Sequence, residues 1–246
     1  MLEVQNVSVN YRGVRALEPL SIDFAAGELV GLIGPNGAGK STLIKAILGL
    51  VPASGRVLWN GLPLRRQRQR VAYVPQRSQI DWDYPTTVWN VVLMGTTALR
   101  GWWRPPGREA QRRAYAALER VDLVGLRDRA IGALSGGQQQ RVFLGRALAQ
   151  QADLFLLDEP FTGVDRKTEA MMLAVFSALK AQGKTLLVCS HEWGDRLQQY
   201  DRLLLLNQQL LADDRPEGVM TLENIHRAYG QNLQLVKPSA DLPFVC

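Results

Sequence analysis

The chain has 246 residues, with 29 lysines and arginines against 23 aspartates and glutamates, so its formal net charge is +6. This length suits one domain with its own core, and the 46% of hydrophobic residues excludes a largely disordered chain. No apolar stretch approaches the ~20 residues that cross a bilayer, and the N-terminus lacks a basic and then apolar signal. If the protein works at a membrane, another chain is expected to provide the span.

The positive charge is compatible with nucleic acid, an anionic membrane face or a polyphosphate ligand. Only two cysteines occur, Cys189 and Cys246, which argues against a disulfide framework and predicts two free thiols. With two histidines and two cysteines, none at ligand spacing, no transition-metal site is recognisable.

The first elements in chain order are strands. Residues 2–10 and 20–24 alternate apolar and polar side chains, as half-buried strands do. Residues 29–33 are continuously apolar, which is typical of a strand covered on both faces. That strand runs into a glycine-rich loop, and the apolar spacing of residues 42–48 predicts a helix directly after the loop.

Residues 56–59 predict a short strand, and Asn60 with Gly61 predicts a tight hairpin turn. Residues 65–70 are strongly basic. We interpret this stretch as a solvated surface hairpin near an anionic membrane face, with nucleic-acid binding as the alternative.

Residues 78–150 have a mostly helical pattern, including a predicted helix from residue 108 to near residue 125. Two apolar strands follow, at residues 154–157 and 185–190, with a helix predicted between them at residues 166–181. Apolar strands that alternate with helices predict an α/β fold with a mainly parallel sheet, into which the helical segment is inserted. A last strand is expected at residues 202–206, and the pattern after residue 208 is weak.

The glycine-rich loop has the spacing Gly-x-x-x-x-Gly-Lys-Ser, between an apolar strand and a helix, which is the context of a phosphate loop. Glycines let successive backbone N–H groups face phosphate oxygens, and the helix presents its positive end to the same anion. Lys40 is expected to reach the β- and γ-phosphates, and the Ser41 hydroxyl to bind Mg²⁺. The residues predicted to hold ATP from this loop are Gly34, Pro35, Asn36, Gly37, Ala38, Gly39, Lys40, Ser41 and Thr42.

Two carboxylates, Asp158 and Glu159, end the apolar strand at residues 154–157. In open α/β sheets, ligands bind beyond the carboxyl ends of the strands, where the phosphate loop also lies. Asp158 is therefore predicted to hold Mg²⁺, and Glu159 to polarise the water that attacks the γ-phosphorus.

A third motif gives the sequence a family resemblance. Leu134, Ser135, Gly136, Gly137 and Gln138 precede a helical run and resemble the signature of ATP-binding cassette (ABC) proteins. Ser135 is a suitable helix N-cap, so the signature predicts a second anion-binding helix terminus.

The resemblance implies the fold of a P-loop ABC ATPase, with an N-terminal antiparallel β subdomain and an inserted helical subdomain. It also implies a head-to-tail homodimer, in which the phosphate loop of one protomer and the signature of the other enclose each ATP. It identifies Tyr11 as the ring that stacks on adenine, Gln76 as a contact to Mg²⁺ and the attacking water, Asp165 as a dimer contact, and His191 as the γ-phosphate switch. The implied divisions are a nucleotide-binding core at residues 1–77 and 151–207, a helical subdomain at 78–150 and a tail at 208–246.

The segment at residues 73–95 is similar to the cassettes of bacterial manganese importers, a group with zinc and iron relatives. It occurs where ABC importers dock their membrane subunit, which implies a docking role for Trp82, Asp83 and Tyr84. The expected protein is a peripheral motor subunit on the cytoplasmic face of the bacterial inner membrane, bound to a polytopic permease and, through it, to an extracytoplasmic metal-binding protein. Zinc or iron transport is an alternative. A soluble ABC ATPase acting on nucleic acid or ribosomes is another, disfavoured because the chain has one cassette and no long coiled-coil insertion.

Overall fold

The computed structural model describes residues 1–97, 105–190 and 195–230, and its contacts separate into two units. The first unit joins Met1–Arg66 with the segment that begins at Leu187, and the second is Gln67–Leu186. The boundary at Leu187 lies within strand β8 (Thr185–Cys189), so one strand contributes residues to both units. The predicted subdomain bounds stay a prediction.

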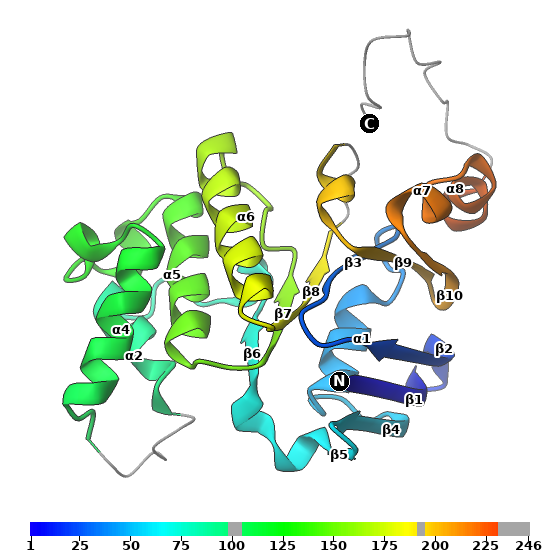
Figure 1. Cartoon of the computed structure of the whole chain (residues 1–246), viewed down its shortest axis with the longest axis horizontal. Helices are drawn as coiled ribbons and strands as arrows, with labels where there is room; N and C mark the ends of the chain where they lie inside the picture. Colours follow the sequence, from blue (N-terminus) through cyan, green and yellow to red (C-terminus); the bar gives the residue numbers. More distant parts are fainter. Residues whose placement is uncertain (98–104, 191–194, 231–246) are drawn as a thin grey trace, which may run out of the picture. The chain divides into compact units, whose positions relative to one another are not determined.

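The first unit contains the antiparallel strands predicted at the N-terminus. Figure 1 shows β1, β2 and β4 side by side, and the full order of this sheet is β2-β1-β4-β5. Buried and exposed side chains alternate along much of β1, because one face of the sheet packs on the core. The bounds are Leu2–Tyr11 for β1, Val14–Phe24 for β2, Ser54–Trp59 for β4 and Leu62–Pro63 for β5.

The first unit also contains the strands that lead to the phosphate loop, in the order β10-β9-β3-β8. All five residues of β3 (Leu29–Ile33) are buried, as the continuous apolar run predicts. β3 pairs in parallel with β9 (Arg202–Asn207), and helix α1 (Lys40–Ile47) follows the loop. Cys189 is buried in β8, while Cys246 lies outside the described residues.

The segment after residue 208 has more structure than its weak pattern predicts. β10 (Gln209–Asp214) pairs antiparallel with β9, and two helices follow, α7 (Pro216–Val219) and α8 (Leu222–Tyr229). Thr221 caps α8 by accepting a hydrogen bond from the Asn224 backbone N–H at 3.3 Å. The weak pattern of this segment did not predict these elements, because β10 forms by pairing with β9.

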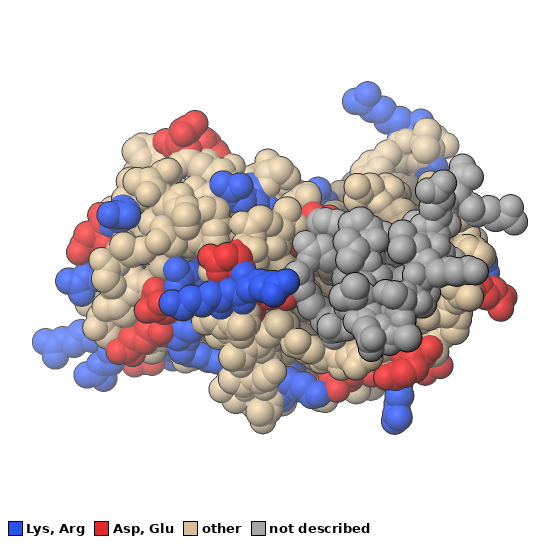
Figure 2. Space-filling model, turned by 90° about the horizontal axis from the view of Figure 1, so that it is seen from above, with Lys and Arg blue, Asp and Glu red and all other residues tan. Residues whose placement is uncertain are grey.

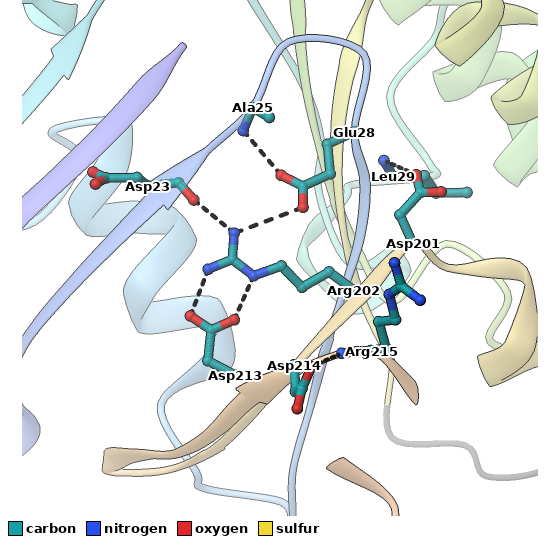
Figure 3. A network of polar contacts seen from close by, with 9 residues as sticks. All are labelled: Asp23, Ala25, Glu28, Leu29, Asp201, Arg202, Asp213, Asp214 and Arg215. Carbon is teal, nitrogen blue, oxygen red and sulfur yellow. Dashed lines mark hydrogen bonds and ion pairs between the residues drawn. The ribbon is translucent and has the colours of Figure 1, made fainter. Parts of the chain in front are cut away.

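Arg202, the first residue of β9, joins three segments of the first unit (Figure 3). Its guanidinium binds both carboxylate oxygens of Asp213 on β10 and donates to the backbone carbonyl of Asp23 at 2.8 Å. The Glu28 carboxylate lies 3.6 Å away and also accepts a hydrogen bond from the Ala25 N–H at 2.9 Å. The two-pronged bond to Asp213 raises the pKa of Arg202 above its ordinary value.

Replacing Arg202 with Met is expected to lower the free energy of unfolding by about 1–3 kcal/mol, because the half-buried Asp213 carboxylate loses a charge-assisted partner. Denaturant unfolding measures this loss. Arg15→Met is the control, since Arg15 pairs with Glu18 where both side chains are largely exposed. Equal losses in the two variants would show that the Arg202 network adds nothing beyond a surface ion pair.

The second unit contains the helices expected from the middle of the sequence. Helices α2, α4 and α5 pack against one another, and α6 follows strand β7 (Figure 1). Strands β6 and β7 pair in parallel, from Val71 opposite Leu154 to Val74 opposite Leu157. The bounds are Val71–Val74 for β6, Val88–Met94 for α2, Arg108–Arg120 for α4, Gly136–Ala149 for α5, Leu154–Asp158 for β7 and Arg166–Ala181 for α6.

Asp153, which directly precedes β7, forms hydrogen bonds with residues at the amino ends of β6 and β8 in the second unit. Its carboxylate accepts from Lys184, which precedes β8, and from Arg70, which precedes β6, each at 2.7 Å. Its backbone carbonyl accepts from the Thr185 N–H at 3.0 Å. Burial alone would raise the pKa of Asp153, but the hydrogen bonds from Lys184 and Arg70 outweigh it and hold that pKa below the ordinary value.

Asp153→Asn is expected to destabilise the protein by about 0.5–1 kcal/mol at pH 7, a value kept small by solvent screening of these partly exposed groups. Because the folded-state pKa is lowered, the unfolded chain binds more protons as the pH falls below about 4. The stabilisation is therefore complete above that pH and is lost below it. Unfolding curves of both proteins between pH 7 and 3 measure this, and a difference that stays constant would contradict it.

The basic stretch at residues 65–70 forms two 3-10 helices, Leu64–Arg66 and Arg68–Arg70, so the hairpin expected there is wrong. The hairpin turn lies at Asn60 and Gly61, between β4 and β5. All four arginines of the stretch are exposed, in agreement with a solvated surface. On the face that Figure 2 shows, basic and acidic side chains are interspersed rather than gathered into a patch of one sign.

Candidate active site

The loop between β3 and α1 has the backbone that a phosphate loop needs. Gly34, Gly37 and Gly39 have φ angles of 151°, 80° and 92°, which L side chains rarely adopt. A Cβ on Gly34 would lie 2.0 Å from the Leu206 carbonyl oxygen, and one on Gly39 would lie 2.9 Å from that of Ala16. The loop therefore passes too close to neighbouring backbone for any larger residue at these two positions.

Helix α1 begins at Lys40, and no side chain caps its N-terminus. The first N–H groups of a helix have no partner within the helix, and the helix dipole adds partial positive charge there. Lys40 is 6% exposed, and its ammonium donates to the carbonyls of Gly34 at 2.7 Å and Pro35 at 3.0 Å. These bonds hold the cation over the loop, so the loop, the helix end and Lys40 together form an anion-binding cradle.

Tyr11 is the last residue of β1, and the turn that follows it brings Val14 opposite it on β2. Its side chain is 41% exposed. An exposed ring at the end of a rigid strand is suited to stacking on a flat ligand such as a nucleobase, and the adenine contact stays a prediction.

The carboxylates and Gln76 lie together in the second unit. The parallel register of β6 and β7 brings the carboxyl ends of both strands to one edge, so Gln76 lies near Glu159. The Gln76 side-chain amide donates to Glu159 Oε2 at 2.8 Å, and Asp158 is completely buried at the end of β7. Glu159 has a φ of 50°, an uncommon value for a non-glycine residue. Such backbone strain is frequent at functional sites.

The oxygen donors predicted for Mg²⁺ fit a hard cation. Asp158 offers a carboxylate, Ser41 a hydroxyl at the start of α1, and Gln76 its amide oxygen, because its amide nitrogen is directed to Glu159. Within the described residues, no group of three His, Cys, Asp or Glu side chains could hold a metal ion by itself.

The signature begins helix α5. The Ser135 side chain accepts from the Gln138 N–H at 3.3 Å, and the Gln138 side chain accepts from the Ser135 N–H at 3.0 Å. This capping box confirms Ser135 as the N-cap. The Leu134 side chain is buried, and Gly136 and Gly137, which have no side chains of their own, form the first turn of the helix.

Two residues that sequence reasoning missed connect Gln76 to the signature. Arg77 Nε donates to the Gln139 Oε1 at 2.9 Å, and the Gln139 amide donates to the Ile131 carbonyl at 3.3 Å. Each is the direct neighbour of a predicted site residue, since Arg77 follows Gln76 and Gln139 follows Gln138. That adjacency is the signal that could have identified them.

The three docking candidates differ in burial. Trp82 is half-buried, packs edge-on against Phe143 with ring centroids 5.4 Å apart, and donates to the Arg77 carbonyl at 3.1 Å. Asp83 and Tyr84 are exposed, Tyr84 by 58%. Trp82 thus contributes to the packing of the second unit, whereas the other two face solvent.

Asp165 is the N-cap of α6 and accepts from the Thr168 N–H at 2.7 Å. That hydrogen bond lowers the pKa of Asp165 below its ordinary value. The structure thus assembles Lys40 and the phosphate loop in the first unit, and Gln76, Asp158, Glu159, the signature and Asp165 in the second. His191 lies outside the described residues.

Comparison with known proteins agrees with this set of motifs. Residues 17–162 match the family described as ABC transporter. The zinc transport system ATP-binding protein TroB of Treponema pallidum is 48% identical over 230 residues, covering 93% of this chain and 86% of TroB. The manganese transport system ATP-binding protein MntB of Bacillus subtilis is 46% identical over 237 residues, covering 96% of this chain and 95% of MntB.

Solved structures show the same fold. A dimeric ATP-binding cassette in a post-hydrolysis state, bound to ADP and phosphate, has a TM-score of 0.78 at 27% identity and covers 88% of this chain and 99% of that chain. An ABC transporter in an inward-facing conformation has a TM-score of 0.79 at 26% identity, covering 93% of this chain and 88% of that chain. No helix in the described residues is long and apolar enough to cross a membrane. The predicted α/β fold is confirmed, and the chain belongs to the ABC transporter family as an ATP-hydrolysing cassette.

Proposed function

We propose that this protein is the ATP-hydrolysing motor of a bacterial metal importer, with manganese as the transported ion. The observation that carries the proposal is the similarity, over nearly the whole chain, to the MntB and TroB subunits of manganese and zinc transport systems. The similar curated proteins include four MntB subunits, which favours manganese, while TroB makes zinc the second candidate.

In the proposed site, the phosphate loop and Lys40 hold the triphosphate of ATP, and Tyr11 stacks on adenine. Glu159 accepts a proton from the attacking water, and Gln76 orients Glu159 through the 2.8 Å hydrogen bond. Ser41, Gln76 and Asp158 would hold Mg²⁺, which supplies charge neutralisation on the β- and γ-phosphates. His191 is proposed as the contact to the γ-phosphate.

The working unit is proposed to be a homodimer, because the chain has two phosphate-binding sites and each ATP would contact one site from each protomer. The second site is the start of α5, where Gly136 and Gly137, directly after the N-cap Ser135, present backbone N–H groups to the ATP held by the partner's loop. Leu134 and Gln138 support that turn from the core and from the capping box, and Asp165 contacts the partner. ATP closes such a dimer because its γ-phosphate contacts both protomers, and hydrolysis removes that contact.

The permease is proposed to dock on the segment around residues 82–84, which begins six residues after Gln76. Asp83 and Tyr84 are exposed there and would contact the permease directly, while Trp82 supports them through Phe143 and Arg77. The same assembly places the protein at the cytoplasmic face of the membrane, with an extracytoplasmic metal-binding protein on the other side.

Metal uptake by the reconstituted complex tests the proposal, with manganese, zinc and iron(II) compared at equal concentration. ATP-dependent uptake of manganese that is abolished by Glu159→Gln is the expected result. Preferred uptake of zinc would identify zinc, rather than manganese, as the transported ion. If no metal is taken up and nucleic acid, rather than a copurifying permease, stimulates the ATPase, the motor proposal is wrong.

A further inference from the structure

The second unit contains a cavity of about 640 Å³ that the nucleotide chemistry does not use. It lies between α4, the end of α5, the amino ends of β6 and β7, and the turn between α6 and β8. Pockets of this volume commonly hold small organic ligands. The charged residues that line it are Arg70, Arg112, Arg113, Arg120, Asp153 and Lys184.

The lining is strongly cationic. Five basic side chains face the cavity against one carboxylate, and both oxygens of that carboxylate, Asp153, are bound at 2.7 Å by Lys184 and Arg70. Arg113 pairs with Glu109 at 2.8 Å, but the Glu109 side chain is 65% exposed and does not line the cavity. The positive charge of the cavity is therefore only partly compensated by the protein itself.

The arrangement of α4 concentrates this charge. Arg113, Ala116, Ala117 and Arg120 recur at three- and four-residue spacing, so they share one face of the helix. Another part of the cavity wall is apolar and buried, and it is formed by Leu148, Phe155 and Leu179. Low-dielectric walls of this kind strengthen the field of the surrounding charges and raise the affinity for an anion.

The cavity is separate from the catalytic residues of the same unit. Asp153 and Arg70 precede β7 and β6, whereas Glu159 and Gln76 follow the carboxyl ends of these parallel strands. A strand of five residues at ~3.3 Å each puts roughly 15 Å between the two edges. A ligand in the cavity would therefore not touch Glu159.

We propose that this cavity binds a small phosphate-bearing anion at the edge opposite the catalytic residues. Arginine guanidinium groups bind phosphate oxygens in pairs, and the cavity presents four of them together with Lys184. Such a ligand would connect α4 to the amino ends of β6 and β7 and so restrain the helical part of the second unit against its strands. The phosphate could belong to a soluble molecule or to the headgroup of an anionic lipid.

Binding of inorganic pyrophosphate, measured by isothermal titration calorimetry, tests the site. Two forms of the full chain limit competition from the phosphate loop: a Lys40→Ala background, in which the loop binds phosphate more weakly, and the wild type saturated with a non-hydrolysable ATP analogue, in which the loop is occupied. In both, the double change Arg112→Gln with Arg120→Gln is expected to raise the Kd for pyrophosphate at least tenfold. The matched control is Arg108→Gln with Arg129→Gln, two exposed arginines of the same unit outside the cavity, which is expected to leave the Kd unchanged.

Vesicles distinguish the two sources of phosphate. Cosedimentation with phosphatidylglycerol vesicles that falls in the cavity variant, but not in the control variant, identifies a lipid headgroup. Pyrophosphate binding with no such difference on vesicles identifies a soluble anion. The proposal is overturned if neither probe binds, or if the cavity and control variants lose binding equally, since the effect would then come from net charge alone.

Discussion

Glu159→Gln is expected to lower the rate of ATP hydrolysis by about 10²- to 10⁴-fold while leaving ATP binding intact. The amide has nearly the same shape as the carboxylate and can still accept the hydrogen bond from Gln76, but it cannot take a proton from water. Phosphate release measures hydrolysis, and equilibrium binding of labelled ATP measures affinity. Because the closed dimer then persists, gel filtration with ATP is expected to show a stable dimer.

Glu119→Gln is the matched control, because Glu119 is an exposed carboxylate on α4 in the same unit and belongs to no predicted motif. It is expected to hydrolyse ATP at the rate of the unmodified protein. Near-normal turnover in Glu159→Gln would eliminate Glu159 as the general base. A loss of ATP binding in that variant would instead indicate a structural role for the strained residue at the end of β7.

Lys40→Ala is expected to weaken nucleotide binding about tenfold to a hundredfold, since a hydrogen bond to a charged group contributes ~1.5–3 kcal/mol. The 6% exposure of Lys40 and its bonds to two loop carbonyls mean that its removal also loosens the cradle. Hydrolysis is expected to fall further than binding, because we propose that the ammonium contacts the phosphate on which charge develops. Titration with a fluorescent ATP analogue gives the dissociation constant.

Lys45→Ala is the control for this experiment. Lys45 is in the last turn of the same helix, at the end away from the loop, and carries the same charge. It is expected to bind nucleotide with unchanged affinity. Undiminished binding by Lys40→Ala would overturn the assignment of the phosphate loop, whereas equal losses in both variants would point to destabilisation of α1 as a whole.

Several strands, one long helix and two motifs of this protein are predictable from short stretches of its sequence. Continuous apolar runs predict β3, β7 and β8 within one residue of their ends, and the helix at Arg166–Ala181 is predicted with its bounds. A short segment is enough for these predictions, because the spacing of its apolar residues indicates whether a strand is buried on both faces or a helix on one face. The phosphate loop and the capping box of Ser135 are also predictable from short stretches of sequence, because each requires particular residue types within a few positions.

Pairing over long distances in sequence was decided only by the tertiary structure. The hydrogen bond between Gln76 and Glu159 joins residues 83 positions apart, and it exists because β6 and β7 lie in register. β10 forms because it pairs with β9, although the pattern of its own sequence is too weak to predict a strand. The cationic cavity likewise combines Arg70, α4 and Lys184, whose charges appear in the sequence as separate basic residues. The periodicity of apolar residues indicates which face of a helix or strand is buried, but not which element packs against that face. The site and the cavity depend on which elements pack together, so they follow only from the tertiary structure.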